Sequence, residues 1–302
     1  MFGHRPAADA FRFFKAAVGN AVAAAAPAAY MRWTGETGRG RATESPDAAA
    51  RYFRDTADDL VREFAARRGG RGLDGVSIIE YGPGDVLALA LLCISRGAER
   101  VLCVDRFPLV RSDRRRTEIL RSLLETMPES ERRKALEAFT DPRDPSSPFR
   151  PDRIAYEIRT DGCSGKCAAF DLAHSRAVLE HASRLDKLFA DMRRALKPGG
   201  LALHLVDLKS HGLHRESPLD FLTWPDRAWK LMYGARGAPN RLRVDAYRRA
   251  ACEAGLKSVT TTVIDRAAAA DISAVRPHLS EAFRDLLDED LSVLGFWLAA
   301  ET

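Results

Sequence analysis

The sequence has no run of about 18 uncharged apolar residues, which is the length that a membrane-spanning helix requires. It has only five cysteines in 302 residues, an odd number, and Cys93 and Cys103 lie in apolar runs. These features favour a reduced, cytoplasmic compartment. The Ala-rich stretch at 11–30 loosely resembles a signal peptide, but Lys15, Gly19 and Asn20 interrupt its apolar core. We therefore expect a cytoplasmic protein without a membrane span.

The sequence also lacks a large excess of charge of either sign. Lysine and arginine number 47 against 42 acidic residues, so the net charge is only +5. This excess permits an anionic ligand but does not indicate a nucleic-acid-binding stripe. Cys163 and Cys167 are four positions apart and His174 follows, but no second Cys or His pair lies at zinc-finger distance. We expect neither a nucleic-acid partner nor a metal site.

Patterns typical of strands and helices alternate from residue 73 onward. Strands are expected at 76–80, 100–105, 153–159, 168–173, 201–208, 256–265 and 291–300. Helices are expected at 85–96, 107–138, 177–196 and 244–254, with a turn at 197–200. This alternation predicts an α/β fold with a doubly wound, mostly parallel sheet. Helices at 7–29 and 46–68 precede it, so we assign 1–72 to an N-terminal helical cap and 73–302 to the main domain, with a helical insert at 107–152.

A glycine-rich turn ends the first expected strand, in the sequence Glu80-Tyr-Gly-Pro-Gly-Asp85. Gly82 and Gly84 would let a ligand approach the backbone closely. A dinucleotide fingerprint needs a third glycine where this chain has Leu87, so a pyrophosphate cradle is not favoured. Asp105 ends the second strand, where an acid can accept hydrogen bonds from ribose hydroxyls. Turn and acid together predict an adenosine-bearing ligand; the alternative is a tight turn and an unrelated surface aspartate.

Four ordered motifs resemble those of class I S-adenosylmethionine-dependent methyltransferases. They are residues 80–85, Val101-Leu-Cys-Val-Asp105, Phe170-Asp-Leu-Ala-His-Ser-Arg-Ala-Val-Leu-Glu-His181 and Leu196-Lys-Pro-Gly-Gly200. The resemblance implies a Rossmann-like sheet of seven strands, the last one antiparallel. It also implies S-adenosylmethionine as the cofactor.

The same resemblance implies which residues bind the cofactor. The loop at 161–167 departs from the family pattern, because Cys163 to Cys167 replaces the common apolar-proline run. The implied residues are, for the turn and the methionine end, Glu80, Tyr81, Gly82, Gly84, Ser175 and Arg176; for the ribose, Asp105; and for the adenine, Arg106, Phe107, Asp161 and Gly162.

An acceptor hydroxyl or protonated amine must lose a proton during methyl transfer, and an imidazole is suited to take it. Five of the seven histidines lie between residues 174 and 214. His211 follows the fifth expected strand, so we assign it as the base, with Asp207 as its orienter or as a polar contact to the substrate. Alternatively, His211 is a polar loop residue. We expect His181 to serve in packing.

The segment at 209–243 carries aromatic residues, Phe221, Trp224 and Trp229, that suit a lid over a small organic acceptor, or else helices packed on the sheet edge. We predict a methyltransferase that acts on oxygen or nitrogen of a small-molecule acceptor. The alternatives are an RNA or protein methyltransferase, and a regulatory protein that binds S-adenosylmethionine without catalysis. The oligomeric state is left open.

Overall fold

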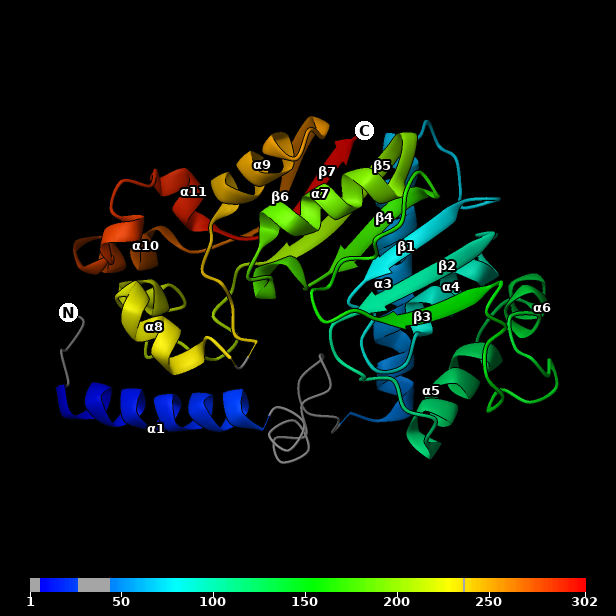
Figure 1. Ribbon diagram of the computed structural model, residues 1–302, viewed down its shortest axis with the longest axis horizontal. Helices are drawn as coiled ribbons and strands as arrows, with labels where there is room; N and C mark the ends of the chain where they lie inside the picture. Colours follow the sequence, from blue (N-terminus) through cyan, green and yellow to red (C-terminus); the bar gives the residue numbers. More distant parts are fainter. Residues whose placement is uncertain (1–5, 27–43, 236) are drawn as a thin grey trace.

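The computed structural model describes residues 6–26, 44–235 and 237–302 (Figure 1). Its strands are β1 (Ser77–Tyr81), β2 (Arg100–Asp105), β3 (Ile154–Ile158), β4 (Phe170–Arg176), β5 (Leu196–Asp207), β6 (Lys257–Arg266) and β7 (Val293–Glu301). Its helices are α1 (Pro6–Ala25), α3 (Pro46–Arg67), α4 (Ala88–Ser95), α5 (Arg114–Glu125), α6 (Glu129–Leu136), α7 (Leu185–Ala195), α8 (Asp226–Tyr233), α9 (Val244–Glu253), α10 (Ala269–Val275) and α11 (Asp288–Ser292). Short 3-10 helices are η1 (Leu179–His181), η2 (Asp220–Thr223), η3 (Arg276–His278) and η4 (Glu281–Phe283).

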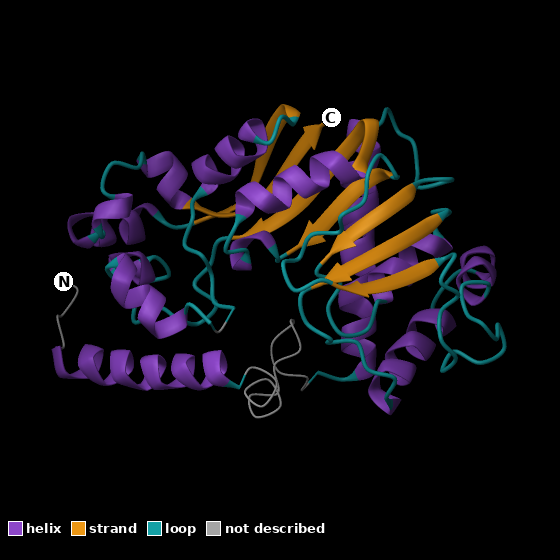
Figure 2. Ribbon diagram, in the orientation of Figure 1, coloured by secondary structure: helices purple, strands orange, loops and turns teal. Residues whose placement is uncertain are grey.

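The strands form one sheet in the order β3-β2-β1-β4-β5-β7-β6. Strands β1 to β5 pair in parallel, whereas β7 runs antiparallel to both β5 and β6 (Figure 2). This confirms the predicted fold, including its antiparallel last strand. Because the parallel strands share a direction, the carboxyl ends of β1, β2, β4 and β5 meet along one edge of the sheet, which we call the carboxyl edge.

Helices cover both faces of the sheet. Side chains alternate in direction along each strand, so each strand places apolar side chains against the helices on both faces. Leu172, Leu201 and Leu203 face the core beneath α3, α4, α5 and α6. Ala173 and Ala202, one position along, face the core beneath α7 and α9. Burial on both faces explains why these strands read as continuous apolar runs in the sequence.

A third hydrophobic cluster forms a side lobe, made of α1, η2, α8, α10, η3, η4 and α11. Apart from α1, which packs on α8, the elements of this lobe follow β5 or β6 in the chain, so they lie beyond the carboxyl edge (Figure 1). Phe221, Trp224 and Trp229 are buried within it. These aromatic side chains therefore pack in the hydrophobic cluster of the side lobe. The lid expected at 209–243 stays a prediction.

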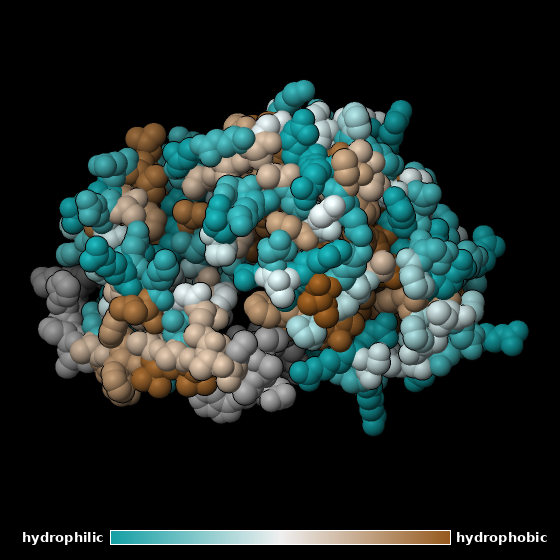
Figure 3. Space-filling view, viewed as in Figure 1, coloured by the Kyte–Doolittle hydropathy of each residue, from teal (hydrophilic) through white to brown (hydrophobic). Residues whose placement is uncertain are grey.

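The two N-terminal helices lie on different parts of the molecule. Helix α1 packs on α8 of the side lobe, and its exposed face is largely apolar (Figure 3). Helix α3 packs on α4 and α5 against the sheet. Whether residues 1–72 act as a cap remains a prediction. Across the described ranges, none of the helices combines the length and the apolar character needed to cross a membrane.

Several predicted boundaries are wrong. The helix expected at 107–138 is two helices, α5 and α6, separated at Met127-Pro128, where proline interrupts a helix. The helix expected at 177–196 begins only at Leu185, after Ala177 takes a left-handed conformation (φ 53°) and η1 forms one short turn. The turn expected at 197–200 lies inside β5, which starts at Leu196 and shifts register against β4 there.

Candidate active site

The glycine turn after β1 reaches the end of β2. The N–H of Gly82 donates to the carbonyl of Val104 at 2.8 Å. Both Gly82 (φ 69°) and Gly84 (φ 75°) are left-handed, a conformation that costs other residues free energy. A Cβ on Gly82 would lie 2.5 Å from Val178, whereas a Cβ on Gly84 would meet nothing within 4 Å. The backbone at Gly84 therefore borders open space, as a turn that receives a ligand should.

Two carboxyl groups flank this turn. Asp105 accepts a hydrogen bond from the N–H of Phe107 at 3.0 Å, and the backbone of Arg106 and Gly84 also lies against its carboxylate. Burial raises the pKa of Asp105 despite these donors. Burial likewise raises the pKa of Glu80 to about 7; its carboxyl group accepts a hydrogen bond from the thiol of Cys103. The turn and the acid that the sequence paired are thus together in the structure.

The residues assigned to adenine also come together. Arg106 donates from Nε to the carbonyl of Thr160 at 3.4 Å, and its guanidinium lies over the ring of Phe107. Gly162 (φ 76°) packs on the Arg106 side chain, so close that a Cβ would lie 3.2 Å from Cγ. Asp161 is exposed and accepts a hydrogen bond from the N–H of Cys163 at 3.0 Å. Its role toward a ligand stays a prediction.

Ser175 and Arg176 are the last two residues of β4, not residues beyond it. Ser175 is fully buried, and its hydroxyl is hydrogen-bonded to Nδ1 of His204 at 2.8 Å. Arg176 donates to Asp59 of α3 at 3.2 Å and lies over the ring of Tyr52. Arg176 thus joins α3 to the carboxyl edge.

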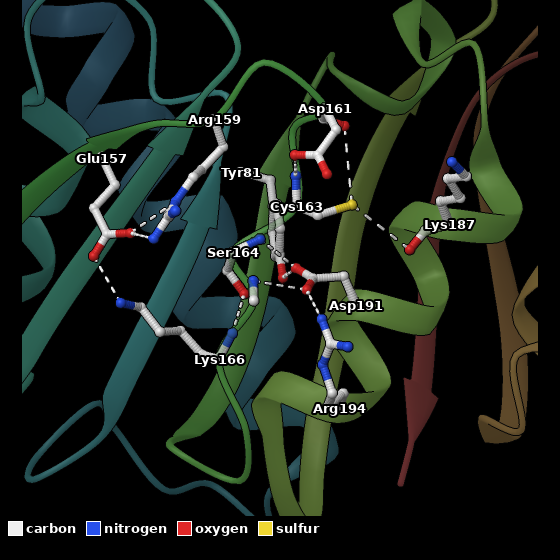
Figure 4. Close-up of polar contacts among 11 residues, drawn as sticks. Tyr81, Glu157, Arg159, Asp161, Cys163, Ser164, Lys166, Lys187, Asp191 and Arg194 are labelled. Carbon is white, nitrogen blue, oxygen red and sulfur yellow. Dashed lines mark hydrogen bonds and ion pairs between the residues drawn. The ribbon is translucent and has the colours of Figure 1, made fainter.

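The side chain of Tyr81 lies on the face of the sheet that α7 covers, and it points toward Asp191 (Figure 4). Its hydroxyl donates to Asp191 of α7 at 2.8 Å. Asp191 also accepts from the N–H groups of Ser164 and Gly165 and from Arg194. Burial alone would raise the pKa of Asp191, but these donors lower it below its ordinary value. This network fixes the loop that carries Asp161, so only the backbone of Tyr81 remains available at the turn.

On the acceptor side, His211 lies beyond β5 in a left-handed conformation (φ 50°). The carboxyl group of Glu180 lies beside its ring, with Nε2 to Oε1 at 4.0 Å, and burial raises the pKa of Glu180 well above its ordinary value. Asp207 instead accepts from the N–H of Lys209 at 2.9 Å, which shapes the turn that leads to His211. The ring of His181 lies 5.0 Å from the ring of His211, centroid to centroid.

Comparison with known families decides the class of enzyme. A family model described as a methyltransferase domain matches residues 49–261, which span the turn, both acids and the acceptor side. The chain belongs to this methyltransferase family. Its cofactor is accordingly S-adenosylmethionine, as the motifs predicted. None of the curated proteins compared with the methyltransferase matches it.

Solved structures resemble the methyltransferase only distantly. An S-adenosylmethionine-dependent methyltransferase from Mesorhizobium loti is 19% identical with a TM-score of 0.44, and the match covers 82% of this chain and 100% of that one. Phosphoethanolamine N-methyltransferase 2 from Haemonchus contortus, in complex with S-adenosylmethionine, is 18% identical with a TM-score of 0.44. That match covers 78% of this chain and 51% of the other. Such distant likenesses do not identify an acceptor.

Two features of the methyltransferase site were missed from the sequence. Glu180 was not singled out, although a glutamate beside His181 in an otherwise apolar stretch was visible. The second is Asn240, whose side-chain amide donates to the carbonyls of Leu179 and Ala182 and so holds η1 in place. Arg243 is buried, and its guanidinium donates to the carbonyls of Leu208, Leu291 and Val293.

Proposed function

We propose that this methyltransferase acts on oxygen or nitrogen of a small organic acceptor, bound where β4 and β5 end. The observation that carries the proposal is the placement of His211. Its imidazole is one-third exposed, 4.0 Å from a buried carboxyl group, and beyond the same sheet edge as the glycine turn and Asp105. The side lobe lies beyond that edge too, which favours an enclosed acceptor over a flat macromolecular surface.

S-adenosylmethionine, when bound, supplies a methyl group that its sulfonium has already activated. What remains for the protein is to position the acceptor, exclude water and remove one proton. We assign the proton to Nε2 of His211, with Asp207 holding the preceding turn and Glu180 placed to stabilise the imidazolium. The residues proposed to hold the cofactor are Gly82, Gly84 and the carboxyl groups of Glu80 and Asp105, with Arg106, Phe107, Asp161 and Gly162 around the adenine and Ser175 and Arg176 toward the methionine end.

A screen for the acceptor tests the proposal. Purified protein and S-adenosylmethionine with a labelled methyl group are mixed with a cell extract divided into small-molecule, RNA and protein fractions. Label should enter the small-molecule fraction, and the rate should fall only weakly with added salt. Label confined to RNA, with a rate that falls steeply as salt rises, would contradict a small acceptor and indicate a nucleic-acid substrate.

The role of His211 has its own test. His211→Ala should lower the turnover rate at least about 100-fold while leaving cofactor affinity unchanged, because general-base catalysis typically contributes that much. His278→Ala, in η3 on the side lobe, is the matched control and should behave as wild type. Near-normal turnover of His211→Ala would remove the base assignment without affecting the family.

A further inference from the structure

Three potential metal ligands converge beyond the carboxyl ends of β4 and β5. They are Glu180 and His181 of η1 and His211 of the loop after β5, and one ligand atom from each lies within 4.8 Å of the other two. Among the described residues, one group of His, Cys, Asp or Glu side chains has its ligand atoms this close together, and it is this one. Cys163, Cys167 and His174, weighed from the sequence, do not form such a group.

Two of the three side chains, Glu180 and His181, carry buried polar atoms without the hydrogen-bond partners that such atoms require, whereas His211 is exposed. Glu180 is 1% exposed, and neither of its carboxyl oxygens forms a hydrogen bond of good geometry in the described structure, although the backbone of Glu180 itself and of Asp207 lies against the group. The Nδ1 atom of His181 is buried and unpartnered as well. Leaving such atoms unsatisfied costs free energy, so buried polar groups of this kind point to a missing ligand.

We propose that Glu180, His181 and His211 bind one divalent transition-metal ion of the zinc class. Two imidazoles and one carboxylate suit such an ion better than Mg²⁺ or Ca²⁺, which prefer all-oxygen sites. Three protein ligands leave one coordination position open for water or another small oxygen ligand. This departs from the sequence-based expectation that the chain has no metal site, and binding of the ion does not depend on the proposed function.

Two of the three proposed ligands, Glu180 and His181, are already held in place by their surroundings. The N–H of Asn240 donates to the carbonyl of Glu180 at 2.6 Å, and the backbone of Gly237 and Ala238 lies against the His181 ring. Backbone groups that contact a metal-binding imidazole in this way hold its ring in a fixed orientation. Zinc bonds to N and O are about 2.0–2.2 Å, so the ligand atoms must close by roughly 1 Å.

The exposed loop can provide this movement. His211 is the less buried of the two histidines, and Gly212 follows it with φ 78°. We therefore expect the loop at His211, rather than η1, to move when the ion binds. An ion on Nε2 of His211 would also occupy the lone pair that accepts a proton. Binding of the ion should therefore compete with the base role proposed above.

Cobalt titration of the full-length protein tests the proposal. A Cys167→Ser, Cys252→Ser background removes two exposed thiols that could bind Co²⁺ elsewhere. We expect one Co²⁺ per chain with the visible d–d absorption of a four- or five-coordinate site, displaced by one equivalent of Zn²⁺. His211→Ala should weaken binding at least about tenfold.

His214→Ala is the matched control, because His214 lies in the same loop but is hydrogen-bonded to Ser210. Glu180→Gln should also weaken binding, with circular dichroism to check that this buried variant folds. Binding that is substoichiometric, or that His211→Ala leaves unchanged, would overturn the metal site. Stoichiometric binding without methyl transfer to any fraction would instead leave the metal site standing and count against the proposed acceptor chemistry; Zn²⁺ that stimulates turnover would support the site and overturn the base role.

Discussion

Replacing Asp105 with alanine removes a carboxylate that the structure places at the end of β2, against the backbone of Gly84. In the proposed complex this carboxylate accepts from two ribose hydroxyls, while its bond to the Phe107 N–H forms with or without ligand. Hydrogen bonds to a charged group contribute about 1.5–3 kcal/mol each. We therefore expect a loss of about 3 kcal/mol in binding free energy, or about a 100-fold rise in Kd.

Isothermal titration calorimetry with S-adenosylhomocysteine measures this change. Asp186→Ala is the control, because Asp186 is an exposed acid that pairs with Arg184 at the start of α7. Asp105→Asn should fall between wild type and Asp105→Ala, since the amide keeps one acceptor but no charge. A folded Asp105→Ala variant with wild-type affinity would refute the ribose assignment.

Three further variants probe the buried groups. The pKa of Glu80 is raised to about 7, so the folded state holds its proton and stability should fall by about 2–3 kcal/mol as pH rises from 5 to 8; urea denaturation should show that Glu80→Gln lacks this fall. Burial lowers the pKa of His174 to about 4 and of His204 to about 3, so these groups act in the opposite sense. The free energy of unfolding should therefore fall as pH drops below 6.5, by about 2 kcal/mol for each histidine at pH 5. His204→Gln should make this fall in stability at acid pH smaller. An unchanged fall would contradict a neutral, buried His204 in the folded state. Tyr81→Phe should lower stability by about 1–2 kcal/mol through the lost bond to Asp191, with no change in cofactor affinity; weaker cofactor binding at equal stability would mean that the hydroxyl reaches the site.

The sheet was predictable because its strands are short apolar runs bounded by turns. Buried parallel strands need such runs, and the runs at 76–80 and 100–105 led to β1 and β2 within one residue. Helix starts were less predictable. Asp85 seemed to open a helix, but Leu87 takes a left-handed conformation (φ 61°) and α4 begins at Ala88. A local pattern does not show where the backbone must turn to avoid its neighbours.

That the glycine turn and Asp105 come together could be predicted because each lies at a strand end, and topology alone brings strand ends together; that they bind the cofactor stays a prediction. The arrangement of the acceptor side could not be predicted. His211 was paired with Asp207, four positions earlier, whereas the carboxylate in the structure that lies beside it comes from Glu180, thirty-one positions away on a different element. Similarly, nothing in the sequence links Tyr81 to Asp191 across 110 positions. Such pairs depend on packing between elements rather than on spacing along the chain.

The side lobe has a hydrophobic cluster of its own, distinct from the two that sandwich the sheet. A separate core lets a region vary its sequence while the neighbouring region keeps its folding free energy. If the acceptor binds beside this lobe, as proposed above, changes within the lobe could alter which compounds are accepted while the glycine turn and Asp105 keep their surroundings. Any exchange of residues 209–243 would have to retain Asn240, because its bonds to η1 join this segment to the sheet domain.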